Sequence, residues 1–130
     1  MPLNPLSSPI PLHLRVTSGS KRGTAIGTPT LNADLHDVPK NVPHGIYAGT
    51  VRVDESVFAA AIHYGPRFFH NDTPSFEVHV IDHTITKTPK TIDVLLLAHL
   101  RDVQNFASQE ALQVQISADI AQARSLFPPQ

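Results

Sequence analysis

The chain has 130 residues, of which 41% are hydrophobic, and both values are typical of one soluble globular domain with a buried core. Ten Lys and Arg residues nearly balance eleven Asp and Glu residues, which argues against nucleic acid or an anionic membrane as the main partner. The absence of cysteine excludes a disulfide framework and a zinc-thiolate site. The N-terminus shows neither a signal peptide nor an apolar span, so we expect a cytoplasmic protein.

The first half of the chain is predicted to contain three strands. Four prolines lie among residues 1–11, and proline blocks both helices and central strands, so this segment is predicted to be an extended, poorly ordered lead-in. Apolar and polar residues alternate from Leu12, where the first half-buried strand is predicted to begin. Residues 33–44 are predicted to be a connecting loop. Gly45–Val53 and Val57–Tyr64 follow on either side of a polar break and predict a β-hairpin.

The second half is predicted to contain two further strands and a helix. Ser75–Ile81 alternates between apolar and polar residues, whereas Thr91–Leu100 is a long apolar strand that is predicted to be buried on both faces near its middle. Apolar residues then recur at helical spacing, with Ser108 suited to be the N-cap and Arg124 near the end, where a cation favours the helix dipole. One helix is therefore predicted at about residues 108–127.

These elements together predict an all-β, or β-dominated, fold. Five or six strands are joined mostly by connections that are too short for repeated βαβ units. A small antiparallel barrel with the helix packed on it is the most economical architecture, because closing the sheet removes exposed strand edges. We therefore expect one barrel domain at residues 12–127, with the helix at its C-terminal end.

The stretch with the most chemistry is Gly19–Asn32, which carries three glycines at four-residue spacing, with Lys21 and Arg22 among them. Glycine lets backbone N–H groups approach an anion closely, and the two cations add positive charge. The hydroxyl of Thr30 and the amide of Asn32 supply hard oxygen ligands, so the whole set suits a nucleotide polyphosphate with its Mg²⁺. An ordinary glycine-rich loop between two strands is the alternative interpretation.

Two charged side chains outside this loop are candidates for a site. Glu77 lies in an otherwise apolar strand, opposite Phe76 and Val78, and is either exposed to solvent or, if it faces the end of the glycine-rich loop, a general base. Arg101 follows the long apolar strand. It either binds an anion or a planar ring, or is a solvated residue at the turn before the helix.

Several common sites are excluded by the sequence. It contains no Gly-x₄-Gly-Lys-Ser/Thr P-loop, and no strand–loop–helix unit of the dinucleotide-binding kind surrounds the glycines. It contains no nucleophilic cysteine and no Gly-x-Ser-x-Gly elbow. Eight histidines are scattered along the chain, and only His79 and His83 lie four residues apart, at a strand end. This pattern gives little support to a structural zinc site.

Four segments, in order, resemble those of the riboflavin kinase family, the flavokinase module that most bacteria fuse to an FAD synthetase. The first, Gly-Ser-Lys-Arg-Gly-Thr-Ala-Ile-Gly-Thr-Pro-Thr-Leu-Asn, resembles a family loop that ends in Pro-Thr-Ala-Asn. Pro43–Gly49 is similar to a Pro-x-Gly-Val-Tyr-Ala-Gly strand, and Phe76–His79 to Val-Glu-Val-His. Residues 100–108 are similar to the family's Leu-Arg…Lys-Phe-Asp-Ser. One such segment is weak evidence, whereas four in the same order, over about Leu14–Arg124, are specific.

The resemblance implies a six-stranded antiparallel Greek-key barrel with a C-terminal helix. It also implies ATP-dependent phosphorylation of the ribityl 5′-hydroxyl of riboflavin, giving FMN and ADP, by a protein that we expect to be a monomer without nucleic acid or membrane partners. The implied metal is Mg²⁺, bound by Thr30 and Asn32, and the implied catalytic base is Glu77. The implied nucleotide-binding residues are Gly19, Lys21, Arg22, Gly23, Thr30, Asn32 and His79, and the implied flavin-binding residues are Arg101, Gln104 and Ser108.

The chain also departs from the family pattern. Leu31 replaces the usual alanine and Thr28 a bulky apolar residue, both beside Thr30, while Thr88 and Pro89 replace a Tyr-Gly pair near the nucleotide. These departures keep open a second hypothesis, a flavin-binding regulatory module without kinase activity, and a third, a barrel-type protein-interaction domain. The retained metal ligands and base favour the kinase. No adenylyltransferase domain is recognised, so FAD synthesis is not expected.

Overall fold

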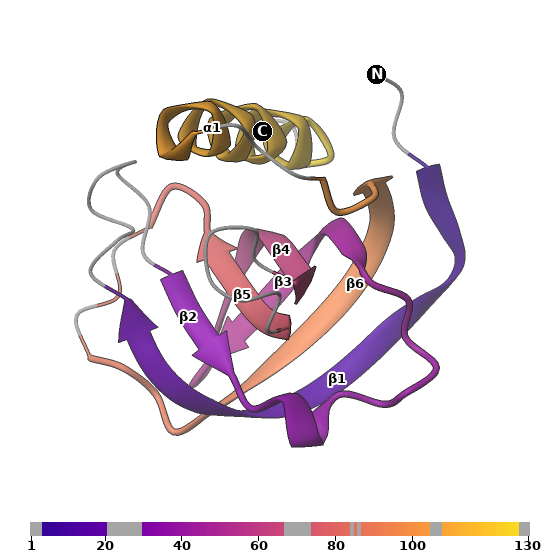
Figure 1. Ribbon diagram of the computed structural model, residues 1–130. Coiled ribbons are helices and arrows are strands. Elements are labelled where there is room, and N and C mark those ends of the chain that lie inside the picture. Colours follow the sequence, from indigo (N-terminus) through magenta and orange to yellow (C-terminus); the bar gives the residue numbers. More distant parts are fainter. Residues whose placement is uncertain are drawn as a thin grey trace.

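The computed structural model describes residues 4–20, 30–66, 74–83, 85, 87–104 and 108–127. Within these ranges, six β-strands are followed by one α-helix (Figure 1). A short 3₁₀ helix, η2 (Leu35–Asp37), follows the second strand, and the C-terminal helix is α1 (Gln109–Ser125). The strands are β1 (Asn4–Ser20), β2 (Thr30–Ala33), β3 (Gly45–Val53), β4 (Ser56–Pro66), β5 (Pro74–Val80) and β6 (Thr91–Arg101).

The strands form a closed antiparallel barrel in the order β1-β2-β5-β4-β3-β6. β2 and β5 are neighbours although β3 and β4 lie between them in the sequence. The segment that contains η2 therefore leads from β2 to the opposite side of the barrel, where β3 lies between β4 and β6. The predicted fold class, a six-stranded antiparallel barrel with a C-terminal helix, is confirmed.

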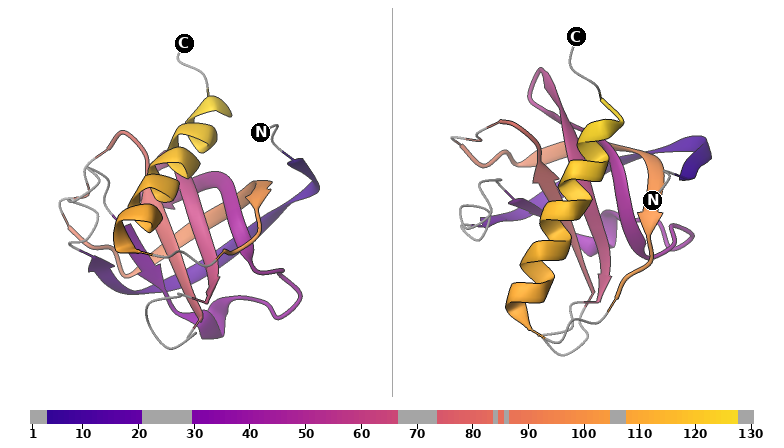
Figure 2. Two further views of the ribbon diagram at one scale, coloured as in Figure 1. Left: turned by 45° about the horizontal axis from the view of Figure 1, so that its top comes forward. Right: turned by 90° about the horizontal axis from the view of Figure 1, so that it is seen from above.

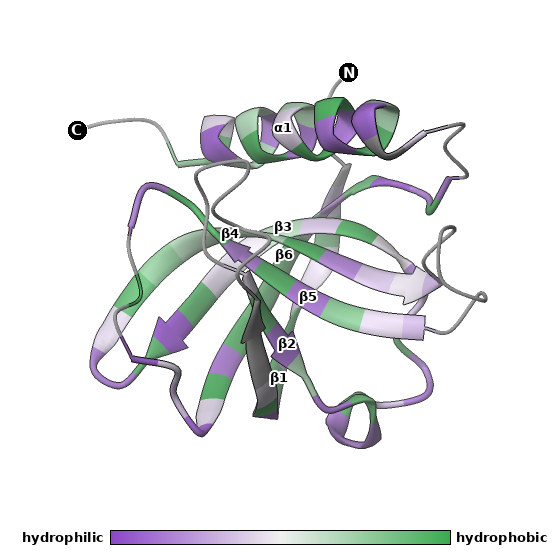
Figure 3. Cartoon of the chain, turned by 60° about the vertical axis from the view of Figure 1, so that its left-hand side comes forward, coloured by the Kyte–Doolittle hydropathy of each residue, from purple (hydrophilic) through white to green (hydrophobic). Residues whose placement is uncertain are grey.

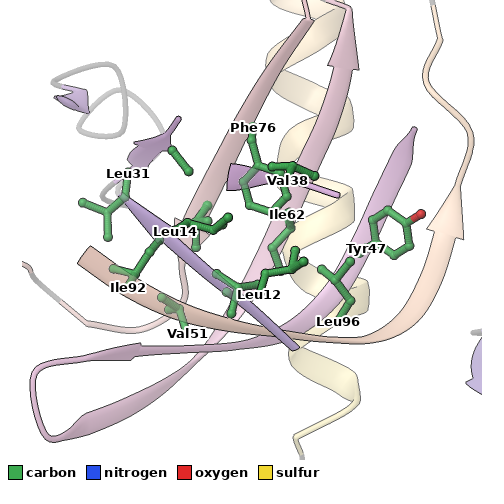
Figure 4. Packing of buried hydrophobic residues seen from close by; sticks show 14 of the residues in the cluster. Leu12, Leu14, Leu31, Val38, Tyr47, Val51, Ile62, Phe76, Ile92 and Leu96 are labelled. Atoms are coloured by element: carbon green, nitrogen blue, oxygen red, sulfur yellow. The ribbon is translucent and has the colours of Figure 1, made fainter. Parts of the chain in front are cut away.

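The barrel interior is filled by apolar side chains from all six strands. Leu12, Leu14, Ile62 and Phe76 are each at most 4% exposed and pack in one cluster (Figure 4). Apolar and polar residues alternate along β5, as the colouring in Figure 3 shows. Because successive side chains of a strand point to opposite faces, each apolar residue inside the barrel leaves its neighbours on the outer face.

The helix α1 packs on the outer face of the barrel, against β3, β4 and β6 (Figure 2). Ile120 and Ala123 of the helix are buried with Ala48, Ala61 and Ala98 of these strands. Small residues let the helix lie close to the sheet, and the apolar surface buried there stabilises the pair. Within the described residues, no helix combines the length and apolar character that crossing a bilayer requires.

The strand β6 supplies residues to two separate apolar clusters. Ile92, Val94 and Leu96 belong to the barrel interior, whereas Ala98 and Leu100 lie beneath α1. The change of face coincides with shifts in the register between β3 and β6. The prediction that this strand is buried on both faces near its middle is met only in part, because Leu95 and Leu97, which alternate with these residues, are half-buried.

Residues at the start of β1 correct one prediction. The strand begins at Asn4 rather than at Leu12, and its first residues pair with β6, as does the stretch from Ile10 onward. Where the structure describes it, the lead-in is extended as predicted, but it is a paired strand of the barrel and not a poorly ordered segment outside it. Pairing with β2 begins only at Val16, so the first part of β1 has a paired strand on one side. Prolines are tolerated in such an edge stretch because their missing N–H can face the unpaired side.

The predicted hairpin and helix agree well with the structure. The predicted strand Gly45–Val53 has the bounds of β3. The N-cap of α1 is Ser108, whose Oγ accepts a hydrogen bond from the backbone N–H of Ala111 at 3.1 Å. Arg124 lies in the last turn, and its guanidinium donates to both carboxylate oxygens of Asp82, at 3.0 and 2.9 Å.

Gly49 lies where the backbones of β3 and β6 approach each other closely. A Cβ atom at this position would lie 2.0 Å from the carbonyl oxygen of Leu95. The register between the two strands shifts beside this residue, between Ala48 and Gly49. A side chain at this position would therefore have to push two paired backbones apart.

Gly49→Ala is expected to lower the free energy of unfolding by roughly 1–3 kcal/mol, the usual cost of overpacking, because the obstructing atom belongs to the backbone. Gly45→Ala is the control, since a Cβ atom there would meet the Nε2 atom of His99 at 2.7 Å, and that side chain can turn away. Urea unfolding of both variants measures the difference. A Gly49→Ala variant as stable as the parent chain would contradict the close approach.

Candidate active site

The polar residues of β5 lie on the outer face of the barrel. Phe76 and Val78 belong to the interior cluster and are at most 1% exposed. Alternation along the strand then places Glu77 and His79 on the opposite face. Neither of these side chains is fully exposed to solvent: Glu77 is half-buried, and His79 is only 8% exposed.

The residues of β2 are arranged in the same way. Leu31 is 2% exposed and packs in the barrel interior, where Figure 4 shows it with Leu14 and Ile92. Its neighbours Thr30 and Asn32 therefore point to the outer face. Leu31, which stands where the family usually has alanine, thus packs inside the barrel and away from the face that carries Thr30 and Asn32.

The register of β2 with β5 brings the candidate residues together. Thr30 is paired with His79, and Asn32 is paired with Glu77. Thr30 Oγ1 and His79 Nδ1 lie 3.0 Å apart in a buried hydrogen bond. Two segments that are far apart in the sequence, the end of the glycine-rich segment and β5, thus place their polar residues side by side on one surface.

Glu77 has close polar neighbours at one carboxylate oxygen. Ser75 Oγ donates to Oε2 at 3.2 Å, and His63 Nδ1 lies 3.8 Å from the same oxygen. His63 is the register partner of Glu77 on the other side, in β4. Because the Glu77 side chain is only 15% exposed, the alternative interpretation, a solvated strand carboxylate, is wrong.

A single transverse row connects this carboxylate with Arg101. His63 pairs with Ile46 of β3, and Ile46 pairs with Arg101 at the end of β6. The row therefore crosses five adjacent strands and joins the candidate metal ligand, the candidate base and the candidate flavin-binding arginine. Its members, in order, are Asn32, Glu77, His63, Ile46 and Arg101.

Arg101 forms a buried ion pair with α1. Its Nε and Nη2 atoms donate to the two carboxylate oxygens of Asp119, at 2.9 and 2.8 Å. Gln115 donates to the same carboxylate at 3.1 Å. The side chains of Arg101 and Asp119 are 14% and 5% exposed, so the alternative interpretation of Arg101 as a solvated residue is wrong. Flavin binding by Arg101 stays a prediction.

Asp119→Ala is expected to lower the free energy of unfolding by about 3–5 kcal/mol, because it leaves the guanidinium of Arg101 buried without its counter-charge. Arg124→Ala is the matched control, since the Arg124–Asp82 pair also joins α1 to the barrel but has side chains 50% and 62% exposed. An exposed pair contributes at most about 1 kcal/mol. Urea unfolding of the two variants tests this, and equal losses would contradict a special role of the buried pair.

The glycine-rich segment is only partly described. Gly19 lies in β1 and is paired with Leu31, so the strands extend further into the predicted loop than expected. Thr30–Asn32, predicted as the tail of the loop, belongs to the short strand β2. Lys21, Arg22 and Gly23 lie outside the described residues.

The two remaining flavin-binding candidates lie between β6 and α1. Gln104 is exposed beyond the end of β6. Ser108 is exposed and uses its hydroxyl oxygen to cap α1. A serine hydroxyl that accepts one hydrogen bond still has a proton to donate, so capping is compatible with ligand binding.

Sequence reasoning missed three residues of this region, His63, Ser75 and Asp119. Ser75 lies two residues before Glu77, on the same face of β5, and strand alternation places it there. The proximity of His63 depends on which strand lies beside β5, which the sequence pattern does not show. Asp119 is 4% exposed beside Ile120, and a carboxylate next to the apolar stripe of a helix is a signal for a buried ion pair.

The donor atoms of β2 fit a magnesium ion. Among the described residues, no cluster of three or more His, Cys, Asp or Glu side chains could hold a metal ion. Mg²⁺ needs only one or two protein oxygens when phosphates and waters complete its shell. If the Thr30 hydroxyl donates to His79 Nδ1, both lone pairs of its oxygen stay available to a cation. Together with the amide of Asn32, Thr30 offers a suitable pair of hard ligands.

The closed barrel, its flanking helix and this row of oxygen ligands and carboxylate define a β-barrel domain with a site suited to a metal-bound phosphate. A family model described as "Flavokinase: Riboflavin kinase" matches residues 6–127. The chain therefore belongs to the riboflavin kinase family.

Curated relatives are longer proteins. The bifunctional riboflavin kinase/FMN adenylyltransferase of Pseudomonas fluorescens is 33% identical over 127 residues, which are 95% of this chain and 40% of that protein. The Bacillus subtilis protein of the same description is 30% identical over 116 residues, or 86% of this chain and 37% of the relative. The chain thus spans about two fifths of the length of these relatives.

Solved structures share the fold. A Streptococcus pneumoniae structure described as a macrolide-efflux protein aligns with a TM-score of 0.72 and 29% identity, over 90% of this chain and 39% of that one. The riboflavin kinase of Trypanosoma brucei aligns with a TM-score of 0.58 and 20% identity, over 92% of this chain and 80% of that one. The second likeness is one of fold alone.

Proposed function

We propose that this domain transfers the γ-phosphoryl group of ATP to the ribityl 5′-hydroxyl of riboflavin, giving FMN and ADP. The observation that carries the proposal is the register of β2 with β5, which sets the oxygen ligands Thr30 and Asn32 beside the carboxylate of Glu77. Phosphoryl transfer needs neutralisation of phosphate charge and a proton acceptor for the attacking hydroxyl. Membership of the family supports the choice of substrates.

In the proposed reaction, the 5′-oxygen of the ribityl chain bonds to the γ-phosphorus while the bond from phosphorus to the leaving oxygen of ADP breaks. The carboxylate of Glu77 takes the hydroxyl proton and releases it to water after the products leave. The partly buried setting suits this role, because a carboxylate shielded from bulk water interacts more strongly with a positioned hydroxyl.

The nucleotide side of the site is proposed to lie at the joined ends of β1 and β2. Thr30 and Asn32 would hold Mg²⁺, and His79 would accept the hydrogen bond of the Thr30 hydroxyl and so fix its direction. Bound there, Mg²⁺ neutralises charge on the nucleotide phosphates. Gly19 and residues 21–23 are proposed to contact those phosphates through backbone N–H groups and positive side chains.

The flavin side is proposed to lie toward the end of β6 and the start of α1, at Arg101, Gln104 and Ser108. Its support is the transverse row that connects Arg101 with Glu77. A substrate that spans this row would carry its ribityl hydroxyl to the carboxylate. Since ATP and riboflavin are both intracellular small molecules, we propose that the domain works in the cytoplasm.

A flavin-binding module without kinase activity is the alternative. Leu31 is one of the departures from the family pattern that motivated this alternative. It now supports the alternative only weakly, because its side chain packs inside the barrel and does not face the site. The oxygen ligands and the carboxylate on the outer face remain together. This arrangement favours the kinase over the module.

Glu77→Gln is expected to lower the rate of FMN formation roughly 10²- to 10⁴-fold, the usual contribution of a general base, because an amide cannot accept the hydroxyl proton. Separation of the flavins by chromatography, with ATP and Mg²⁺ present, measures the rate. Glu55→Gln, in the exposed β3–β4 turn, is the control and should leave the rate unchanged. An unchanged rate for Glu77→Gln would remove this residue from the mechanism.

Thr30→Val is expected to raise the Mg²⁺ concentration needed for half-maximal activity at least about tenfold, because it removes one oxygen ligand while keeping the shape of the side chain. Titration of the FMN-forming activity with Mg²⁺ measures the shift. Thr50→Val, at a half-buried threonine of β3, is the control. A Mg²⁺ requirement that matches the parent chain would show that Thr30 is not a ligand.

A further inference from the structure

The carboxylate of Glu77 is approached from two strands at the same oxygen. Ser75 Oγ, from its own strand, donates to Oε2 at 3.2 Å, and His63 Nδ1, from β4, lies 3.8 Å from Oε2. The family resemblance points to Glu77 but gives no role to either neighbour. The His63 contact comes from the side away from β2, since His63 of β4 and Asn32 of β2 are the register partners of Glu77 on its two flanks.

The surroundings of Glu77 restrict the movement of its carboxylate. The side chains of His63 and Glu77 are 19% and 15% exposed, and the Nδ1 atom of His63 is buried from solvent. A buried ring nitrogen needs a hydrogen-bond partner, and the carboxylate of Glu77 lies just beyond hydrogen-bond length from it, at 3.8 Å. Both residues are held in paired strands, where backbone hydrogen bonds leave the side chains little freedom to separate.

A general base acts through one oxygen whose lone pair must point at the proton being removed. Rotation about the last bond of a glutamate side chain is soft, so an unrestrained carboxylate spends much of its time in unproductive orientations. Donors that hold one oxygen fix the plane of the group and thereby aim the other oxygen. The register partner of Glu77 toward the proposed phosphate site is Asn32 of β2.

We propose that Ser75 and His63 are positioning residues that hold Glu77 by Oε2, so that Oε1 accepts the proton of the substrate hydroxyl. This inference rests on the proposed function. The 3.8 Å separation of His63 Nδ1 from Oε2 exceeds a hydrogen-bond length, and contacts of this kind commonly shorten when substrate binds. The Ser75 contact already has hydrogen-bond length.

The test compares two substitutions at position 63. In His63→Asn, the amide nitrogen stands as far along the side chain as Nδ1 and can still donate to Oε2, whereas His63→Leu removes the donor at similar size. His63→Leu and Ser75→Ala are each expected to lower kcat roughly three- to tenfold, with the KM values for riboflavin and ATP unchanged, because they remove one oriented donor without touching substrate. His63→Asn is expected to recover most of the loss.

His13 provides a matched control. Its Nδ1 also contacts a carboxylate, that of Asp93 at 2.7 Å, but the pair is exposed, with side chains 70% and 56% accessible. His13→Leu and His13→Asn should both leave kcat unchanged. Thermal unfolding of every variant separates loss of fold from loss of rate.

The outcomes are distinct. An unchanged kcat in both His63→Leu and Ser75→Ala, or a His63→Asn variant as slow as His63→Leu, overturns the inference. Failure of the parent chain to form FMN contradicts the proposed function instead. The contact itself is checked without turnover from the ring-nitrogen NMR signals of His63, which Glu77→Gln is expected to shift, and unchanged signals would refute the contact.

Discussion

The pairing of β2 with β5 is the constraint on which the rest of this structure depends. β2 has only four residues, yet it closes the barrel between β1 and β5. The same four pairs set Thr30 beside His79 and Asn32 beside Glu77. The same pairing therefore closes the interior and brings the candidate site residues together. A slip of a single residue would turn Thr30 and Asn32 into the core and expose Leu31.

Strand alternation separates two sets of demands along these strands. Residues that point inward, such as Leu31 and Phe76, are constrained by the volume of the barrel interior. Residues that point outward, such as Glu77, are constrained by the chemistry of the candidate site. A chain can therefore depart from the family pattern at an inward position and keep its outward groups together. This explains why Leu31, which lies between the two candidate metal ligands in the sequence, is accommodated among Leu14 and Ile92.

The sequence predicted the features that depend on local patterns of residues. It did not predict the features that depend on which strands pair with each other. The local pattern predicted the bounds of β3 and the start of α1 at the cap Ser108, but it extended the helix to residue 127, beyond its end at Ser125. It assigned Glu77 to a polar face correctly, but it could not show that His63 lies beside it, since that follows from register. The proline content led to a wrong prediction for the N-terminal segment. Prolines argue against a central strand, but they do not show that a segment lacks a neighbouring strand to pair with.

Arg101 shows how a residue of the site region can also hold the fold together. The pattern around it indicated either a residue that binds an anion or a planar ring, or a solvated residue at the turn before the helix. Its ion-pair partner, Asp119, lies 18 residues further along the chain, within α1. The pair fixes α1 over the end of the row that contains Glu77. The helix is therefore held beside the candidate site by this ion pair as well as by its apolar contacts with the barrel.

The position of β6 has a consequence for how the domain opens. This strand pairs with both β1 and β3, and its residues fill the barrel interior at one end and the layer beneath α1 at the other. No local fluctuation can free it without dissolving both apolar clusters. Its central amide protons should therefore exchange with solvent only through global unfolding, whereas amides at the N-terminal end of β1 can exchange by fraying of one edge. β6 is thus the strand whose exchange rate reports the stability of the whole domain.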